Sequence, residues 1–281
     1  MIILRADILG VCMGVEKALD RVIKLREENP GVPIATIGPL IHNSRVLSRL
    51  AEKGIEVVAD PGDFPRGLAV IRAHGLPPKE RLRYETAGVT VVDATCPRVI
   101  ASQKRVAESS SRGRFVVLVG DPGHGEIQGL SGFVDEKGPG WAVAASPEEA
   151  RALTLPGETL VIAQTTIKQE EYDAVVEVLR RKGVELEVAR SICPATRDRQ
   201  TALKELARKV DALLIIGGKN SANTTALYTT ALATGKPAWH IEGAGDIPGE
   251  VRKYHRVGLS AGASTPDWII AEVEASLSGN G

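Results

Sequence analysis

Short, continuous apolar runs recur along the whole chain and alternate with segments of helical pattern. Seven runs stand out, at residues 32–41, 68–74, 89–95, 114–120, 159–166, 212–218 and 256–262. Such runs are typical of strands buried on both faces of a parallel sheet. The segments between them, such as 43–54 and 168–183, repeat apolar residues at helical spacing and end at glycine. The alternation predicts βαβ units and therefore an α/β fold.

Three cysteines divide this pattern into thirds. Cys12 follows the N-terminal apolar segment, which we interpret as a strand, and Cys96 and Cys193 also lie between a predicted strand and a predicted helix. We therefore expect three similar α/β units with mostly parallel sheets, arranged with pseudo-threefold symmetry. Their expected bounds are 1–95, with the N-terminal strand and Cys12, then 96–192, and 193–281 with the C-terminal segment.

Composition narrows the class of protein. Of 281 residues, 43% are hydrophobic and 25% charged, as in an ordinary globular protein, and the formal net charge is zero. A nucleic-acid binder normally carries a basic stripe, so neither nucleic acid nor a membrane surface is an expected partner. No run is long enough to span a membrane, and the first residues lack the features of a signal peptide. An odd number of scattered cysteines is a poor disulfide framework, so we expect a reducing, cytoplasmic location.

Two of the cysteines share one local design. Cys96 and Cys193 are each followed by proline and, seven residues on, by glutamine. A cysteine at a helix N-terminus lies in positive potential, which favours the thiolate that soft metals bind. Three converging thiolates would leave one coordination position open, either on a single metal ion or on an iron–sulfur cluster. The alternative is that these are buried apolar cysteines. A local C-x-x-C motif is absent, which argues against a zinc ribbon.

Polar residues follow most of the predicted strands. They are His42, Asn43, His74, His124, Glu126, Thr165, Thr166, Asn220, Ser221, Asn223 and Ser264. Ligands of parallel sheets bind at these strand ends, and imidazole, hydroxyl and amide groups can together bind a phosphoryl anion. Glu126 is the one carboxylate in a His- and Gly-rich loop. If buried beside a substrate it could deliver a proton, although it could instead cap the loop.

Nine short motifs, in order, extend over essentially the whole chain. They are "GVCMGV", "GPLIHN", "RAHG", "DATCP", "GHGE", "QTT", "ICPATRDRQ", "KNSANT" and "SAGAS". With them the chain resembles the 4-hydroxy-3-methylbut-2-enyl diphosphate reductase family, the last enzymes of non-mevalonate isoprenoid biosynthesis. The resemblance implies an oxidoreductase that removes the allylic hydroxyl of this substrate to give isopentenyl and dimethylallyl diphosphate. It also implies three α/β domains around a central iron–sulfur cluster.

The resemblance assigns roles to individual residues. It implies that Cys12, Cys96 and Cys193 hold one 4Fe-4S cluster, whose open fourth iron binds the substrate hydroxyl oxygen. The implied catalytic residues are Glu126, which supplies protons, Thr165 and His124. The implied diphosphate-binding residues are His42, His74, His124, Ser221, Asn223 and Ser264. An external one-electron donor, such as a ferredoxin or flavodoxin, is the implied partner.

Two positions depart from the family pattern. Gly125 replaces the usual proline before Glu126, which predicts a more mobile loop. Ala222 replaces a serine and removes one phosphate contact, at a cost of roughly 0.5–1.5 kcal/mol.

Two rival hypotheses remain open. One is a redox-neutral dehydratase or condensing enzyme of the quinolinate synthase type, which also uses a three-cysteine 4Fe-4S cluster. The other is a non-catalytic α/β binding module.

Overall fold

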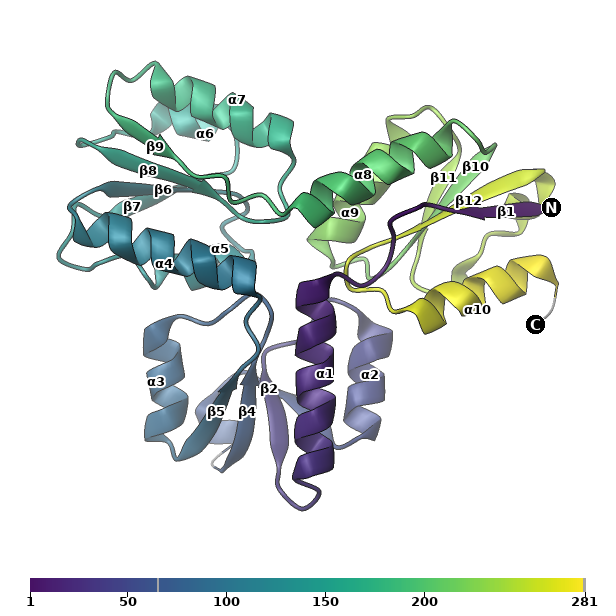
Figure 1. The fold of residues 1–281 in the computed structure, drawn as a ribbon, viewed down its shortest axis with the longest axis horizontal. Coiled ribbons are helices and arrows are strands. Elements are labelled where there is room, and N and C mark those ends of the chain that lie inside the picture. The colour runs from purple at the N-terminus through teal and green to yellow at the C-terminus, as the bar shows by residue number, and fades with distance from the viewer. Residues whose placement is uncertain (65, 280–281) are drawn as a thin grey trace. The chain divides into compact units, whose positions relative to one another are not determined.

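The computed structural model describes residues 1–64 and 66–279 (Figure 1). By their contacts, these residues form two compact units. The first unit comprises Met1–Glu16, Ile41–Arg49 and Pro194–Gly281, and the second comprises Lys17–Leu40 and Leu50–Cys193. Two helices, α1 (Met13–Glu28) and α2 (Ser44–Glu52), contain residues of both units. In the part of the chain that the structure describes, no helix is long and apolar enough to cross a membrane.

The first unit contains one parallel four-stranded sheet with the order β1-β12-β10-β11. Its strands are β1 (Ile2–Arg5), β10 (Ala212–Ile216), β11 (Ala238–Ile241) and β12 (Arg256–Ala261). Its helices are α8 (Pro194–Ala207), α9 (Ala222–Leu232) and α10 (Asp267–Ser278), with 3₁₀ turns at Ala244–Asp246 and Gly249–Lys253. Leu203 of α8 and Leu227 of α9 pack in one core cluster with Leu213 and Ile215 of β10.

The second unit contains two parallel sheets, ordered β3-β2-β4-β5 and β7-β6-β8-β9. The strands of one are β2 (Ile34–Ile37), β3 (Ile55–Val58), β4 (Gly67–Ile71) and β5 (Val89–Asp93), and those of the other are β6 (Phe115–Val119), β7 (Trp141–Ala144), β8 (Thr159–Ala163) and β9 (Leu186–Val188). The helices are α3 (Pro78–Thr86), α4 (Pro97–Ser111), α5 (Gly125–Ser131), α6 (Pro147–Ala152) and α7 (Gln169–Arg180), with a 3₁₀ turn at Pro61–Asp63. Core clusters cover both faces of the β6–β9 sheet.

The three sheets share one strand order. In each sheet, one inner strand (β2, β6 or β10) is followed in sequence by an outer strand (β3, β7 or β11), and the chain then returns to the other side of the inner strand (β4, β8 or β12). The fourth position is taken by β5, β9 or β1. The expectation of an α/β fold with similar parallel sheets is therefore confirmed.

The N-terminal strand β1 does not pair with the strands that come next in sequence. Sequence order placed β1 in a unit of residues 1–95, but β1 pairs with β12 and completes the C-terminal sheet. The division of the chain at residues 95 and 192 stays a prediction. All seven apolar runs contain a strand, whereas the outer strands β3, β7 and β11 were not predicted.

Candidate functional site

The three cysteines occupy equivalent positions in the three sheets. Each immediately precedes a helix (α1, α4 or α8), after the strand in the fourth sheet position. The N–H of Cys12 donates to the carbonyl of Ala263 at 3.2 Å, that of Cys96 to Ala73 at 3.0 Å, and that of Cys193 to Thr165 at 3.0 Å. Each acceptor lies two residues beyond the end of β12, β4 or β8. The shared design predicted for two cysteines thus extends to the backbone of all three.

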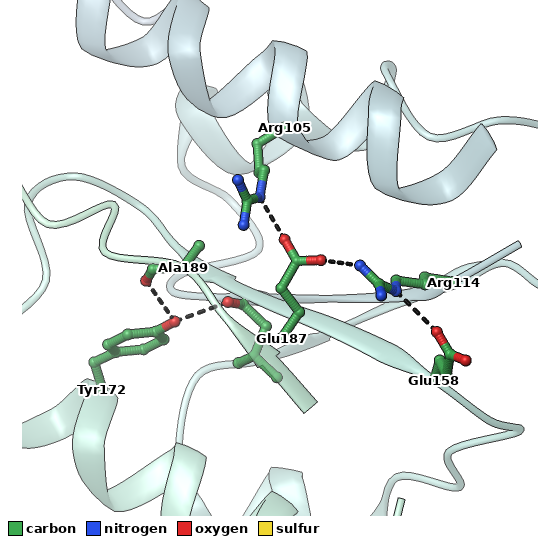
Figure 2. A network of polar contacts seen from close by, with 7 residues as sticks. Arg105, Arg114, Glu158, Tyr172, Glu187 and Ala189 are labelled. Atoms are coloured by element: carbon green, nitrogen blue, oxygen red, sulfur yellow. Dashed lines mark hydrogen bonds and ion pairs between the residues drawn. The ribbon is translucent and has the colours of Figure 1, made fainter. Parts of the chain in front are cut away.

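The elements that carry Cys96 and Cys193 are joined by an ion-pair network (Figure 2). Glu187 on β9 pairs with Arg105 on α4 and with Arg114 before β6, and Arg114 also pairs with Glu158 at 3.1 Å. On the other side of β9, the Tyr172 hydroxyl lies within hydrogen-bond distance of two carbonyl oxygens, Val161 at 2.8 Å and Ala189 at 2.9 Å, and its single proton is donated to one or shared between them. Helix α4, which begins directly after Cys96, is therefore linked to strand β9, which ends a few residues before Cys193.

The three thiols are chemically suited to bind an iron–sulfur group. All three cysteines are partly exposed, and they form no disulfides. Cys12 belongs to the first unit, and the other two belong to the second. Among the residues that the structure describes, no three His, Cys, Asp or Glu side chains gather closely enough to hold one metal ion. Cysteine thiolates are the usual protein ligands of iron–sulfur clusters.

Glu126 is a buried carboxyl group held by one partner residue. Its side chain is 1% exposed. Its Oε1 accepts from the N–H of Thr165 at 2.9 Å, and its Oε2 accepts from the Thr165 hydroxyl at 2.8 Å. Burial raises the pKa of Glu126 from 4.5 to about 7, although the Thr165 hydrogen bonds oppose this rise. A carboxyl group of this kind can hold and release a proton near neutral pH.

Two of the predicted histidines are linked to Glu126 through its backbone. The rings of His74 and His124 meet edge to face, with centroids 5.3 Å apart. His124 caps α5, because its Nδ1 accepts from the N–H of Glu126 at 3.2 Å. In a neutral ring, this leaves Nε2 of His124 as the N–H donor. The second unit thus brings together His74, His124, Glu126 and Thr165.

Arg72, which was not among the predicted site residues, lies against the same loop. Its guanidinium occupies the space beside Gly125, where an added Cβ would lie 2.6 Å from Nη2. Its Nε is buried and has no hydrogen-bond partner among the described residues. The available signal was the arginine of the "RAHG" motif, two residues before His74.

The remaining predicted polar residues gather in the first unit. Ser221 caps α9 through the N–H of Thr224 at 3.4 Å. The hydroxyl of Ser264 lies 3.3 Å from that of Ser221 and 3.4 Å from the carbonyl oxygen of His42. Asn223 Oδ1 accepts from the N–H of Ala263 at 3.1 Å.

A glycine lets the two loops of this group approach one another. A Cβ at Gly218 would lie 2.3 Å from the carbonyl oxygen of His42, so a larger residue there would separate the loops. Asn43 also links the loops, because its Nδ2 donates to the carbonyl of Ser264 at 3.0 Å. His42, Ser221, Asn223 and Ser264 therefore all belong to the first unit, whereas His74, His124, Glu126 and Thr165 belong to the second.

The fold and these residues define an α/β protein with three equivalent thiols and two groups of polar residues at strand ends. The model of the LytB family, described as "LytB protein", matches residues 3–278. The chain belongs to this family. The family implies an iron–sulfur cofactor.

Alignments with relatives and with solved structures cover nearly the whole chain. A 4-hydroxy-3-methylbut-2-enyl diphosphate reductase of Treponema denticola is 46% identical, over 99% of both chains. One of Alkaliphilus oremlandii is 39% identical, over 95% of this chain and 96% of its own. A solved structure of "(E)-4-Hydroxy-3-methyl-but-2-enyl Diphosphate Reductase" is 36% identical over 99% of this chain and all of its own, with a TM-score of 0.74. The fold also matches the Plasmodium falciparum reductase (24% identity, TM-score 0.88, 96% and 86% covered).

Proposed function

We propose that the chain is a 4-hydroxy-3-methylbut-2-enyl diphosphate reductase that forms isopentenyl and dimethylallyl diphosphate. The observation that carries the proposal is the buried Glu126–Thr165 pair beside His74 and His124, in a chain similar to these reductases over its full length. The reaction replaces a C–O bond by a C–H bond, and it consumes two electrons and two protons and releases water. It therefore needs a buried proton donor and an anchor for the diphosphate.

The cofactor in this proposal is one 4Fe-4S cluster held by Cys12, Cys96 and Cys193, with the fourth iron open. When bound, the cluster supplies single electrons and a Lewis-acidic iron at the hydroxyl end of the substrate. The electrons come from an external donor such as a ferredoxin or flavodoxin, and the enzyme acts in the cytoplasm. The ordered cysteine loops support this assignment, because each has the same amide-to-carbonyl bond to its sheet.

The chain's own residues bind the substrate and move the proton. His42, His74, His124, Ser221, Asn223 and Ser264 anchor the diphosphate through side-chain hydrogen-bond donors. Anchoring this end aligns the distant hydroxyl group, so binding energy contributes to catalysis. Glu126 delivers the proton that lets a poor leaving group depart as water. Thr165 orients the Glu126 carboxyl group through two hydrogen bonds.

The family assignment favours the reductase over the quinolinate-synthase-type alternative. A carboxyl group as deeply buried as that of Glu126 also argues against a mere binding module, because desolvation of an acid without a chemical role is costly. For the module, metal and sulfide analysis of the anaerobically purified protein would find neither. For the redox-neutral enzyme, turnover would not need a reductant.

The decisive experiment is an anaerobic assay with 4-hydroxy-3-methylbut-2-enyl diphosphate and a low-potential viologen as the electron source. We expect isopentenyl and dimethylallyl diphosphate as products, and none when the reductant is omitted. A cluster-loaded protein that forms neither product would refute the proposed activity. The Cys96→Ser variant tests the ligand assignment separately, since a full iron and sulfide content in this variant would contradict it.

A further inference from the structure

Arg72 brings a partly buried positive charge to the second unit. Burial lowers the pKa of its guanidinium below the usual value, and no acidic side chain acts against this shift. Its buried Nε has no hydrogen-bond partner in the described ranges. Transfer of an unpaired charge out of water is costly, so a partly buried cation in a folded protein ordinarily has an anionic partner. Among the residues that the structure describes, no acidic side chain forms an ion pair with Arg72.

Two glycines make the space in which this guanidinium lies. An added Cβ would lie 3.0 Å from Nη1 at Gly38 and 2.6 Å from Nη2 at Gly125. Gly38 follows β2 and has φ of +69°, a left-handed conformation that favours glycine, and Gly125 is the first residue of α5. The proline that the family usually has at position 125 would fill the same space. In this chain the absence of a side chain at Gly125 therefore leaves room for the Arg72 guanidinium.

The neighbours of Arg72 indicate which anion it meets. Arg72 lies two residues before His74, and Gly125 lies between His124 and Glu126. The carboxylate of Glu126 takes its hydrogen bonds from Thr165, and Arg72 is not among the groups that shift its pKa. The guanidinium thus lies against Gly125, in the loop that carries His124 and Glu126, and it does not contribute to the pKa shift of the Glu126 carboxyl group.

We propose that Arg72 is a further diphosphate-binding residue, whose guanidinium binds non-bridging phosphate oxygens alongside His74 and His124. This inference rests on the proposed function. Serine and asparagine carry no charge and histidine titrates near neutral pH, whereas guanidinium contributes a permanent charge and a planar set of donors that matches phosphate oxygens. The diphosphate supplies the negative charge that Arg72 lacks, and the departure at Gly125 makes room for this contact.

The test measures binding of inorganic diphosphate to the cluster-loaded protein by titration calorimetry. Replacing Arg72 with glutamine should weaken binding about tenfold or more, because a charge-assisted hydrogen bond is lost. Arg72→Lys should recover part of that loss, and the dependence of the dissociation constant on salt should become shallower only in the glutamine variant. The matched control is Arg112→Gln, which removes the same charge from an exposed position at the end of α4.

A second variant separates binding from packing. Gly125→Ala keeps the charge, but its methyl group displaces the tip of the Arg72 side chain. It should weaken diphosphate binding in the parent and have little further effect in the Arg72→Gln background. An unchanged dissociation constant in folded Arg72→Gln would overturn the inference, as would additive effects of the two changes. The viologen assay of the parent enzyme tests the proposed reductase activity separately from the role of Arg72. If the parent forms the products but Arg72→Gln binds diphosphate as the parent does, only the proposed role of Arg72 is refuted.

Discussion

At the scale of single residues, the chemistry of this protein depends on a balance at Glu126. Burial stabilises the neutral acid, whereas the two hydrogen bonds from Thr165 stabilise the carboxylate, and the result is a pKa of about 7. An acid with a pKa close to the working pH is present in its protonated form and can still give up its proton. The same side chain in water would be almost fully ionised at neutral pH.

Replacing Glu126 with glutamine tests its role as the proton donor. The amide keeps the shape of the side chain but cannot donate a proton, so turnover should fall by about 10² or more. The measurement is the rate of product formation with a chemical reductant, compared at equal iron content. Glu149→Gln is the matched control, because the carboxylate of Glu149 also accepts a backbone N–H but lies on the exposed side of α6. Near-normal turnover of the Glu126 variant would exclude it from the proton path.

Replacing Thr165 with valine should move the pH dependence in a defined direction. The change removes the hydroxyl donor to Oε2 and keeps the backbone donor to Oε1. The carboxylate loses stabilisation, so the pKa of Glu126 should rise above about 7. If the protonated acid is the active form, kcat/KM of the parent falls as pH rises through this pKa. The fall should occur at higher pH in the variant, and a shift toward lower pH would contradict the assigned hydrogen bond.

At the scale of elements, the inner strands could be predicted from sequence and the outer strands could not. β8 and β10 are buried along their whole length, so a continuous apolar run marks them. β3, β7 and β11 pair on one side only and are partly exposed, so their sequences lack that run. The positions of the cysteines and of the polar residues could be predicted because these residues come shortly after strands that the apolar pattern marks.

Other features required coordinates because their cause lies far away in sequence. The partner of β1 is β12, more than 200 residues further along the chain, and no local pattern encodes that pairing. Arg72 likewise belongs to an ordinary strand end. Its importance depends on the absence of a side chain at Gly125 and on the lack of a partner for its buried Nε within the described residues.

The N-terminus of α9 combines a structural role with the proposed binding role. Ser221→Ala should cost about 1 kcal/mol in the free energy of unfolding, because the cap of α9 is lost, and should also weaken binding of inorganic diphosphate. Ser146 caps α6 by the same kind of bond, to the N–H of Glu149 at 3.3 Å, but has no proposed ligand. Chemical denaturation should show similar losses for Ser146→Ala and Ser221→Ala. If both variants bind diphosphate like the parent, Ser221 is a cap alone.

At the scale of the whole molecule, the chain is a permuted series of three similar sheets. β5 and β9 complete the sheets that precede them in sequence, whereas the last sheet is completed by β1 from the other end of the chain. The two ends of the chain lie on neighbouring elements of the first unit, because Arg5 of β1 forms an ion pair with Glu274 of α10. The permutation explains why Cys12 comes first in sequence although its strand occupies the last position of its sheet.

A circular permutant tests this arrangement. The natural ends would be joined by a flexible glycine–serine linker, and new ends would be opened between Pro30 and Gly31, which are exposed in the turn before β2. Every sheet would then be built from consecutive strands, and the three cysteines would each follow the fourth strand of their own sheet. Since exposed turns tolerate new ends and the pairing of β1 with β12 is kept, we expect normal circular dichroism and normal iron and sulfide content.

The matched comparison is a chain that lacks residues 1–11. It keeps all three cysteines but loses β1, so β12, which still pairs with β10, becomes an edge strand and the backbone before Cys12 is no longer fixed. This chain should lose stability and bind less iron than the permutant, although both have altered N-termini. If the truncated chain loads iron and sulfide as fully as the parent, then Cys12 is not positioned by the β1–β12 pairing. In that case the equivalence of the three cysteine loops would have no bearing on how the cofactor is held.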